Sequence, residues 1–556
     1  MTRSTADQPR PLVISTPRIQ QAIAPLFKHL RSICLARGLS TPLNSVMAHF
    51  VFLFLVACAE PQATSPETAI ERQTTLIQNA LIVDGSGLPS YPGSLRIEGS
   101  MIQAVGELNP RPGEPVIDAS GLALSPGFID SHSHHDRGLK AAKDAMPLLT
   151  QGITTAVFGQ DGDSHYPIQT FFDHYDASPA AINIASYVGH NTLRAQVMKA
   201  RQTSEASESD IHRMRELLTS ELQSGALGLS TGLEYEPGIY SAKAEVLALA
   251  EQTAQLGGRY ISHIRSEDRY LWDAVDEVID IGRKTGMPVQ ISHMKLAAKG
   301  LWGQADNLLT RLNEARASGV DITADVYPYE YWQSTMWVLL PDRDPNNLQE
   351  IEYVLDELTP ADGIIFMAFE PNSDYVNRSV AEIAELRGTT PVQTFSDLLK
   401  EAAIWSEQHD GQSAETIMGR SMNEADIRAF LSWPHTNICS DGGFTGHPRG
   451  HGSFARILAR YVREEGLMTL EEAIQAMTSR AAAHLGISNR GLLAPGYQAD
   501  VVLFNPSTIQ DHATVRDGQR LSTGVSKVWV NGQLVLDNGA STGVRSGEII
   551  RQSGTI

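Results

Sequence analysis

Cysteine is scarce in this sequence, which has only Cys34, Cys58 and Cys439 among 556 residues. That number excludes a disulfide-built scaffold and a zinc site made mainly of thiolates. A GxxxxGK[ST] loop is absent, and we find no convincing dinucleotide fingerprint, so these two phosphate-binding loops are excluded. Positive charge is also in deficit, because 64 acidic residues against 44 basic ones leave a formal net charge of −20. Such a surface repels phosphate backbones, and we expect no nucleic-acid partner.

The composition is that of a soluble globular protein, with 42% apolar and 19% charged residues. A chain of this length is too long for one simple core, so we expect two or more domains. One apolar run stands out, "VMAHFVFLFLVAC" at 46–58. It is too short to cross a bilayer as a helix but has the length of a signal-peptide core, with Lys28, Arg31 and Arg37 upstream.

The run ends in "LVAC", which resembles the bacterial lipoprotein cleavage box. The resemblance implies that residues 1–58 are a lipoprotein leader and that Cys58 is lipidated, with 59–73 as a polar tether. We therefore expect a periplasmic or cell-envelope protein held on the membrane by its N-terminal lipid. The alternatives are a buried core helix at 46–58, and a cytoplasmic protein if the leader is not functional. Met1 and Met47 both remain candidate start residues.

The rest of the chain divides into regions with different sequence patterns. Short alternating stretches punctuated by Gly, Pro and Asn occupy 74–124 and return at 490–550, which predicts small antiparallel strands. Between them, over 125–489, apolar strands alternate with helical stretches, as in a parallel (β/α)8 barrel of the TIM type. The segment at about 341–430 is longer than a βα loop needs, and we expect an insert or lid there. The eight predicted strand ends are "GFIDSHSH", "TTAVFGQDG", "INIASYVGH", "ALGLSTGLEY", "RYISHIR", "PVQISHMK", "DITADVYPY" and "TNICSDGG".

Polar side chains collect at the carboxyl ends of these strands, where a barrel carries its active site. Residues two apart on a strand point the same way, so His132 and His134 share a direction, as do His293 and Lys295. Four imidazoles with carboxylates suit Zn²⁺ and its neighbours, and a catalytic site leaves one coordination position for water. The candidate residues are His132, His134, Asp161, Tyr235, His263, His293, Lys295, Tyr327 and Asp441.

Each candidate also has an ordinary structural explanation. A single histidine is more often a hydrogen-bonded core residue than a ligand, Asp441 in "CSDGG" could cap a turn, and Tyr235 and Tyr327 could pack inside the barrel. Their joint placement at successive strand ends favours a metal site, because unrelated polar residues would not be expected to follow strand after strand at the same position.

The motifs together resemble the amidohydrolase superfamily, and within it the D-aminoacylase (N-acyl-D-amino-acid deacylase) family. The resemblance covers about residues 75–550 and rests on motifs that occur in the family's order. It implies a distorted (β/α)8 barrel carrying a small β-sandwich built from both chain ends. The motifs are "PGFIDSHSH", "GALGLSTGLEYEPGIYS", "YISHIRSE", "VQISHMK", "DVYPY", "SDGG…HPRGHGSF", "YVREEGLMTLEEAIQAMTSRAAAHLGI" and "RGLLAPGYQADVVLFNP".

The resemblance also implies residue roles. Asp441 matches the family's catalytic aspartate, and Tyr235 matches a tyrosine near the scissile carbonyl. Lys295, Tyr327 and Arg449 match positions that hold the substrate carboxylate. The implied metal ligands are His132, His134, His263 and His293.

One motif departs from the family. Relatives carry "GNCG" after the second strand, with the Cys as a principal metal ligand, whereas "FGQDGDS" places Asp161 there. We expect Asp161 to bridge two ions, one beside His132 and His134 and the other beside His263 and His293. Its oxygen donors would make Mn²⁺ or Co²⁺ more acceptable than a thiolate would. The alternative is that Asp161 only binds loop amides and that one metal remains.

These features predict a hydrolase of N-acyl-D-amino acids with zinc as the expected metal. The metal would lower the pKa of water from about 16 to about 7 and polarise the acyl carbonyl. Asp441 would move the proton from water to the departing amine, and Tyr235 would donate to the acyl oxygen. The alternatives are a cyclic-amide hydrolase or dipeptidase of the same superfamily and, in another class, a non-catalytic surface lipoprotein. For the substrate side chain, Arg343 is a candidate cation, and Trp332 and Trp337 could line an apolar pocket.

Overall fold

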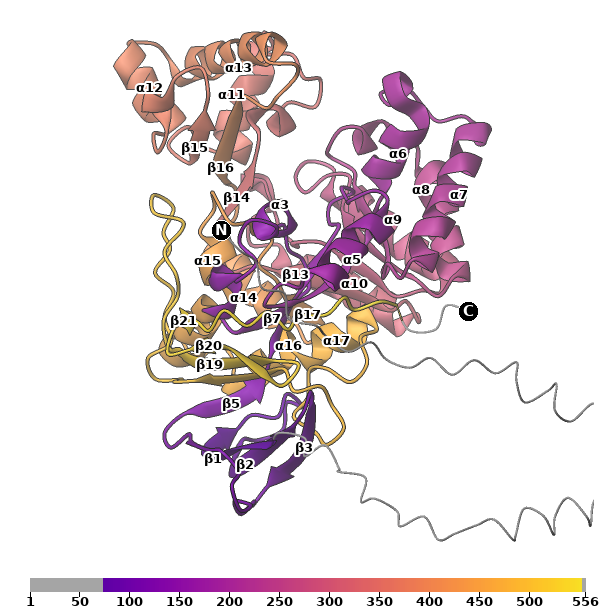
Figure 1. Cartoon of the computed structure of the whole chain (residues 1–556). Helices are drawn as coiled ribbons and strands as arrows, with labels where there is room; N and C mark the ends of the chain where they lie inside the picture. Colours follow the sequence, from indigo (N-terminus) through magenta and orange to yellow (C-terminus); the bar gives the residue numbers. More distant parts are fainter. Residues whose placement is uncertain (1–73, 553–556) are drawn as a thin grey trace, which may run out of the picture. The chain divides into compact units, whose positions relative to one another are not determined.

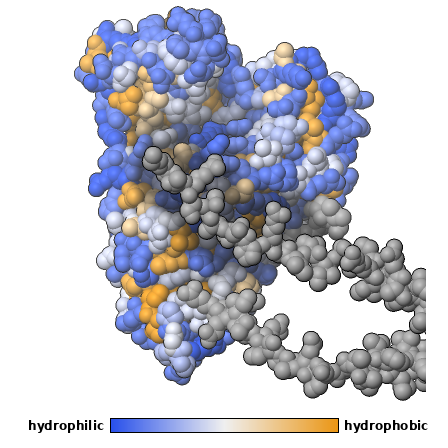
Figure 2. Space-filling view, in the orientation of Figure 1, coloured by the Kyte–Doolittle hydropathy of each residue, from blue (hydrophilic) through white to orange (hydrophobic). Residues whose placement is uncertain are grey.

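The computed structural model describes residues 74–552. The predicted leader, the tether and the lipidation site Cys58 lie outside these residues. Among the helices from residue 74 to residue 552, none combines the length and the apolar character needed to cross a membrane. The face of the molecule in Figure 2 is mostly hydrophilic, with apolar side chains in scattered groups.

Eight parallel strands build the barrel when β8 and β9, which are separated by one residue, are counted as one strand. All eight predicted strand ends fall on these strands. Two hydrogen-bonded sheets are present, β6-β7-β8 and β9-β10-β11-β12-β13-β17. Only Tyr187 separates β8 from β9, and the Asp441 N–H donates to the His132 carbonyl (2.8 Å), which links the last strand segment to the first. The strands are β6 (Phe128–Asp130), β7 (Ile153–Phe158), β8 (Asn183–Ser186), β9 (Val188–Gly189), β10 (Gly228–Gly232), β11 (Arg259–His263), β12 (Val289–Ile291), β13 (Ile322–Val326) and β17 (Thr436–Ile438).

Amphipathic helices cover these strands. In α9 the buried residues Leu271, Val275, Val278 and Ile281 recur every three or four positions, and the helix ends at Gly286 in the left-handed conformation. The helices of this part are α3 (Asp136–Leu139), α4 (Met146–Leu149), α5 (Ile168–Ala177), α6 (His190–Met198), α7 (Glu208–Gln223), α8 (Lys243–Gln255), α9 (Leu271–Thr285), α10 (Ala305–Ala317), α14 (Glu424–Leu431), α15 (Arg449–Arg456), α16 (Leu470–Met477) and α17 (Ser479–Leu485).

Both ends of the described chain contribute to one further sheet (Figure 1). Its nine strands run in the order β21-β20-β19-β18-β5-β1-β2-β3, with β4 beside β1. The antiparallel pairing of β5 with β18 joins the early strands to the late ones, so the two regions form one continuous hydrogen-bonded sheet. The strands are β1 (Thr74–Ile82), β2 (Tyr91–Glu98), β3 (Met101–Gly106), β4 (Val116–Asp118), β5 (Ala123–Pro126), β18 (Val501–Phe504), β19 (Val525–Val530), β20 (Gln533–Asp537) and β21 (Ala540–Ser541).

The insert follows β13 and has a sheet and a core of its own. Strands β14 (Tyr331–Ser334), β15 (Ile364–Phe369) and β16 (Glu415–Arg420) pair antiparallel in the order β14-β16-β15. Helices α11 (Leu348–Tyr353), α12 (Val380–Arg387) and α13 (Pro391–Gln408) complete it, and its core includes Phe366, Phe395 and Ile417.

The predicted insert boundaries of 341–430 need correction. The insert begins earlier because β14 pairs with β16, and it ends earlier because α14 contacts α10, β13 and β17 of the barrel. A long segment without a barrel motif could be recognised in the sequence, but strand partners that lie far apart in the chain could not.

Candidate metal centre

The five predicted metal ligands and the predicted catalytic Asp441 converge at the carboxyl ends of the barrel strands. His132 and His134 follow β6, Asp161 follows β7, His263 ends β11, His293 follows β12 and Asp441 follows β17. Their donor atoms form two groups in which all atoms lie within 4.8 Å of one another. The first group holds His132, His134, Asp161 and Asp441, and the second holds Asp161, His263 and His293.

Asp161 belongs to both groups, and its two oxygens face different histidines. Oδ2 lies 3.2 Å from Nε2 of His134 and 3.4 Å from Nε2 of His132. Oδ1 lies 3.4 Å from Nε2 of His293, which in turn is 3.0 Å from Nδ1 of His263. One carboxylate therefore stands between two pairs of imidazoles.

Three of these residues have a strained backbone. Asp161, His293 and Asp441 have φ values of 52°, 34° and 48°, in the left-handed region that non-glycine residues seldom adopt. Each such residue costs about 1–3 kcal/mol and persists only where the surroundings fix it. Close packing fixes Asp161, because a Cβ at Gly232 of β10 would lie 2.0 Å from the Asp161 carbonyl oxygen.

The electrostatic field of the cluster favours positive charge. Burial alone would lower the pKa of His293, but carboxylates such as Glu267 and Asp161 outweigh it and raise that pKa to about 9. For Asp441, burial would raise the pKa, but Arg449 and the nearby imidazoles hold it well below its ordinary range. The carboxylates are therefore anionic at neutral pH, and the site attracts a cation.

The residues present fit a divalent metal ion. His132 is fully buried, yet neither of its ring nitrogens has a hydrogen-bond partner among the described residues, and the same is true of Asp161 Oδ1. Buried polar atoms without partners are costly, so such atoms facing one another indicate a ligand between them. Nitrogen and oxygen donors without a thiolate suit Zn²⁺, Mn²⁺ or Co²⁺.

A second set of carboxylates lies beside the imidazoles, and two of them, Glu234 and Glu267, form a further donor group with His263. Asp325 Oδ2 is 3.5 Å from Nδ1 of His132, Glu234 Oε2 is 3.0 Å from Nε2 of His263, and Glu267 Oε1 is 2.8 Å from Nδ1 of His293. None of the three was predicted from the sequence. Asp325 could have been found, because it stands two residues before Tyr327 on one strand and so points the same way.

The predicted substrate-binding residues have partners already. Lys295 Nζ lies 2.6 Å from Glu267 Oε1, and Arg449 Nη1 lies 2.6 Å from Asp441 Oδ2. The Arg449 guanidinium also stacks over the Tyr327 ring, 4.6 Å from its centroid. Tyr235 packs against His263 with their ring centroids 4.3 Å apart.

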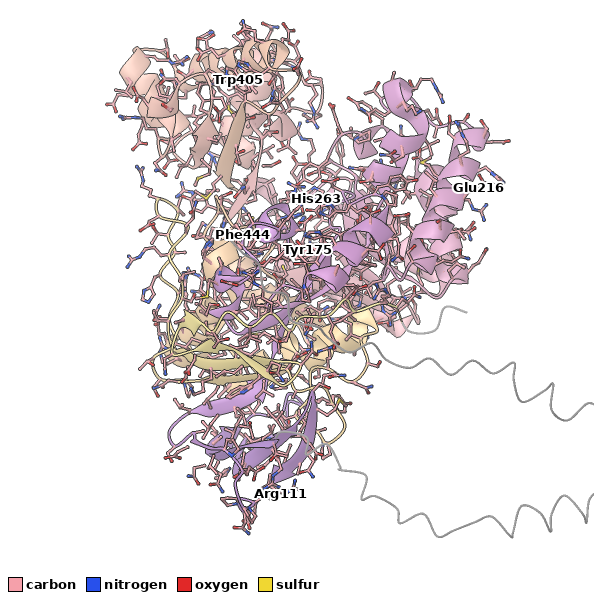
Figure 3. The ribbon with its side chains drawn as sticks, viewed as in Figure 1. Arg111, Tyr175, Glu216, His263, Trp405 and Phe444 are labelled. Atoms are coloured by element: carbon pink, nitrogen blue, oxygen red, sulfur yellow. The ribbon has the colours of Figure 1, made fainter. Side chains whose placement is uncertain are left out.

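Tyr235, Lys295 and Arg449 line a cavity of about 1170 Å³, whereas Tyr327 lies behind Arg449. Figure 3 shows His263 and Phe444, which both line this cavity, in the region between the barrel strands and the insert that carries Trp405. Residues of the insert, such as Trp332 and Leu339, therefore form part of the cavity wall.

The three insert residues expected to contact the substrate side chain have different surroundings. Trp332 lines the cavity and donates through Nε1 to Ser421 Oγ (2.8 Å). Trp337 packs against the insert's own core. Arg343 donates to the carbonyl oxygens of Trp337, Leu340 and Glu234, so it ties the insert to the loop after β10.

Comparisons with known proteins agree with this arrangement. The model of the Amidohydrolase family matches residues 115–336 and 376–536, and the unmatched stretch between them lies in the insert. The chain is 33% identical over 504 residues to the D-aminoacylase of Alcaligenes xylosoxydans xylosoxydans, covering 86% of this chain and 97% of the relative. It is 32% identical over 511 residues to the N-acyl-D-glutamate deacylase of the same organism, covering 87% and 98%.

A solved structure gives the same result. The N-acyl-D-glutamate deacylase from Bordetella bronchiseptica, complexed with zinc and a phosphonate inhibitor, superposes with a TM-score of 0.76 at 31% sequence identity. The match covers 86% of this chain and 100% of that one. By sequence, by fold and by the donor set at its barrel strand ends, the chain belongs to the amidohydrolase family.

Proposed function

We propose that this protein is a metal-dependent hydrolase that cleaves the amide bond of N-acyl-D-amino acids and releases a carboxylate and a free D-amino acid. The observation that carries the proposal is the cluster of four imidazoles with Asp161 and Asp441 at the strand ends of a barrel whose relatives are D-aminoacylases. Such an enzyme acts on carbon–nitrogen bonds other than peptide bonds.

A divalent metal, when bound, supplies a water nucleophile at neutral pH and polarises the acyl carbonyl. His132, His134, Asp161, His263 and His293 would hold one or two such ions. Asp161 would bridge them, because its two oxygens face the two histidine pairs. Zinc is the expected metal, and oxygen donation in place of a thiolate makes Mn²⁺ or Co²⁺ acceptable.

Asp441 is placed to move the proton. The Arg449 guanidinium lies against Asp441 Oδ2. Asp441 Oδ1 lies 3.3 Å from Nε2 of His134 and faces the centre of the cluster. Because Asp441 stays anionic, it can take a proton from the attacking water and then pass it to the amine nitrogen as the amide C–N bond breaks. The leaving group then departs as a neutral amine.

The remaining residues bind and orient the substrate. Tyr235, on the cavity wall beside His263, would donate its hydroxyl proton in a hydrogen bond to the acyl oxygen as negative charge develops there. Lys295 and Arg449 would each contact the substrate α-carboxylate as well as their present carboxylate partners. The Tyr327 ring, which packs against the Arg449 guanidinium, would hold that side chain in place. With the carboxylate and the carbonyl both fixed, only one enantiomer directs its side chain into the cavity.

We also propose that the protein is attached to the membrane through a lipid on Cys58, in the periplasm or elsewhere in the cell envelope. The support is the "LVAC" box at the end of the apolar run.

The experiment that tests the activity is a panel of matched N-acyl-D- and N-acyl-L-amino acids assayed for free amine, with cyclic amides and dipeptides as competing substrates. We expect the D-series to be preferred. Equal rates on matched D and L substrates would contradict the stereochemistry, and a preference for cyclic amides or dipeptides would replace the proposed substrate class.

A further inference from the structure

We propose that Glu234 and Glu267 are positioning residues that orient His263 and His293 for metal binding, through carboxylate oxygens placed at the ring nitrogens outside the cluster shared with Asp161. The proposal rests on the metal centre proposed above. It adds two residues that contribute no donor atom to the shared cluster of imidazoles and Asp161, although their oxygens and His263 form a further donor group within 4.8 Å of one another.

Each of the two imidazoles has one nitrogen inside the cluster and one outside it. In His263 the inner nitrogen is Nδ1 and the outer one is Nε2, which lies 3.0 Å from Glu234 Oε2. In His293 the inner nitrogen is Nε2, and the outer one, Nδ1, lies 2.8 Å from Glu267 Oε1 and 2.7 Å from the Lys295 Nζ that also donates to Glu267. The two rings thus use opposite nitrogens, and in each ring a carboxylate stands at the outer one.

A carboxylate hydrogen-bonded to the outer nitrogen, as Glu234 is at His263, selects the tautomer that metal binding needs. When the outer nitrogen carries the proton and donates it to the carboxylate, the inner nitrogen keeps its lone pair for the metal. The negative charge also raises the basicity of the ring and fixes its rotation. Glu234 and Glu267 would therefore act on metal affinity through His263 and His293.

The two glutamates are held in place by each other and by their surroundings. The Glu267 N–H donates to Glu234 Oε1 (2.9 Å), and Lys295 Nζ donates to Glu267 Oε1 (2.6 Å). Side-chain exposure is 22% for Glu234 and 11% for Glu267, so neither is freely solvated. A carboxylate that is shielded and bonded on several sides keeps a fixed direction, as a positioning role requires.

The insert holds the loops that carry these glutamates. Arg343 donates to the Glu234 carbonyl oxygen. Arg269, two residues after Glu267, pairs with Glu350 of α11 (2.7 Å) and lies over the Tyr353 ring, 4.5 Å from its centroid. Both loops are therefore attached to the insert, although the insert supplies no residue to the donor clusters found among residues 74–552.

The test is metal affinity, measured without reference to turnover. Chelator-stripped protein would be titrated with Zn²⁺ against a chromophoric competitor, and with Co²⁺ by its visible absorption. Glu234→Ala removes the acceptor, whereas Glu234→Gln and Glu267→Gln remove the charge and keep an oxygen. Loss of such outer partners typically weakens metal binding by about 10–100-fold, and we expect a loss in that range with a shifted Co²⁺ spectrum.

Glu236→Gln is the matched control. Glu236 lies in the same loop and lines the same cavity, but its side chain is 51% exposed and is directed to Arg343 and Tyr240. We expect this variant to keep the wild-type metal affinity. Circular dichroism of the metal-free variants separates a lost partner from a lost fold, and if Glu234→Ala does not fold, the two Gln variants decide.

Wild-type affinity and an unchanged Co²⁺ spectrum in the glutamate variants would overturn the proposal, as would an equal loss in Glu236→Gln. A wild-type protein that binds metal but hydrolyses none of the substrates would contradict the proposed function alone. A wild-type protein that binds no metal would overturn both.

Discussion

Glu415, at the start of β16, is a buried carboxylate in the core of the insert. Its side chain is 2% exposed, Oε1 accepts the Met336 N–H (2.8 Å), and Oε2 has no partner among residues 74–552. Burial raises the pKa of Glu415 from 4.5 to about 8, and the single hydrogen bond offsets only part of this effect. At neutral pH the folded insert therefore holds Glu415 largely in its protonated form.

A raised carboxylate pKa favours the folded insert at low pH and disfavours it at high pH. Below about pH 4.5, Glu415 is protonated whether the insert is folded or unfolded, and there is no penalty. Between pH 4.5 and 8 the unfolded form loses the proton first, so the free energy of unfolding falls as the pH rises. At about 1.4 kcal/mol per pKa unit, the full penalty above pH 8 is on the order of 5 kcal/mol.

Glu415→Gln should remove this penalty, because the amide can accept the same hydrogen bond and cannot ionise. We expect the variant to match the wild type at pH 4.5 and to exceed its stability by several kcal/mol at pH 9. Hydrogen exchange of peptides covering β15 and β16, compared between the proteins at each pH, measures the opening of the insert. Glu407→Gln, an exposed substitution on α13, is the control. A stability difference that does not change with pH would refute the reasoning.

Three further predictions concern the site and the leader. Asp441→Asn should retain bound metal but lose about 10²–10⁴ in rate, because the amide cannot accept the proton; wild-type kinetics would remove Asp441 from the mechanism. Asp161→Ala should lose metal after dialysis, as counted by mass spectrometry, and Asp161→Cys should shift the preference towards zinc; wild-type stoichiometry and rate in the Ala variant would exclude Asp161 as a ligand. Cys58→Ser should block lipidation, and mass spectrometry of the mature N-terminus would refute the prediction if wild-type Cys58 is unmodified within an intact leader.

The barrel could be predicted from the sequence because two signals coincide at each strand. The strands are apolar runs buried on both sides, and the polar residues that matter follow directly after them, as His132 and His134 follow β6. This position directly after a strand is the feature by which the candidate metal ligands could be named from the sequence.

Glu234 and Glu267 were not predicted, although Glu234 lies just after β10 within the predicted strand end "ALGLSTGLEY". They lie in loops, where a glutamate is usually solvated, and their importance comes from where His263 and His293 direct their outer nitrogens. The start of the insert was misplaced for a related reason, since β14 becomes a strand by pairing with β16 far along the chain. Contacts set by tertiary structure leave no periodic pattern in the sequence.

The pairing of β5 with β18 joins an early segment of the chain to one of the last segments to be synthesised. Residues 123–126 lead directly into β6 and the first two histidines, but their hydrogen-bonding partners are residues 501–504, near the end of the chain. During synthesis β5 therefore completes its pairing only when almost the last segment has been made, although β6 itself pairs with β7, and loop closure over such a distance is slow. A nascent chain that stops before residue 501 should stay incompletely folded and protease-sensitive. The same delay would keep the chain competent for secretion through a narrow translocation channel, as the proposed lipoprotein leader requires.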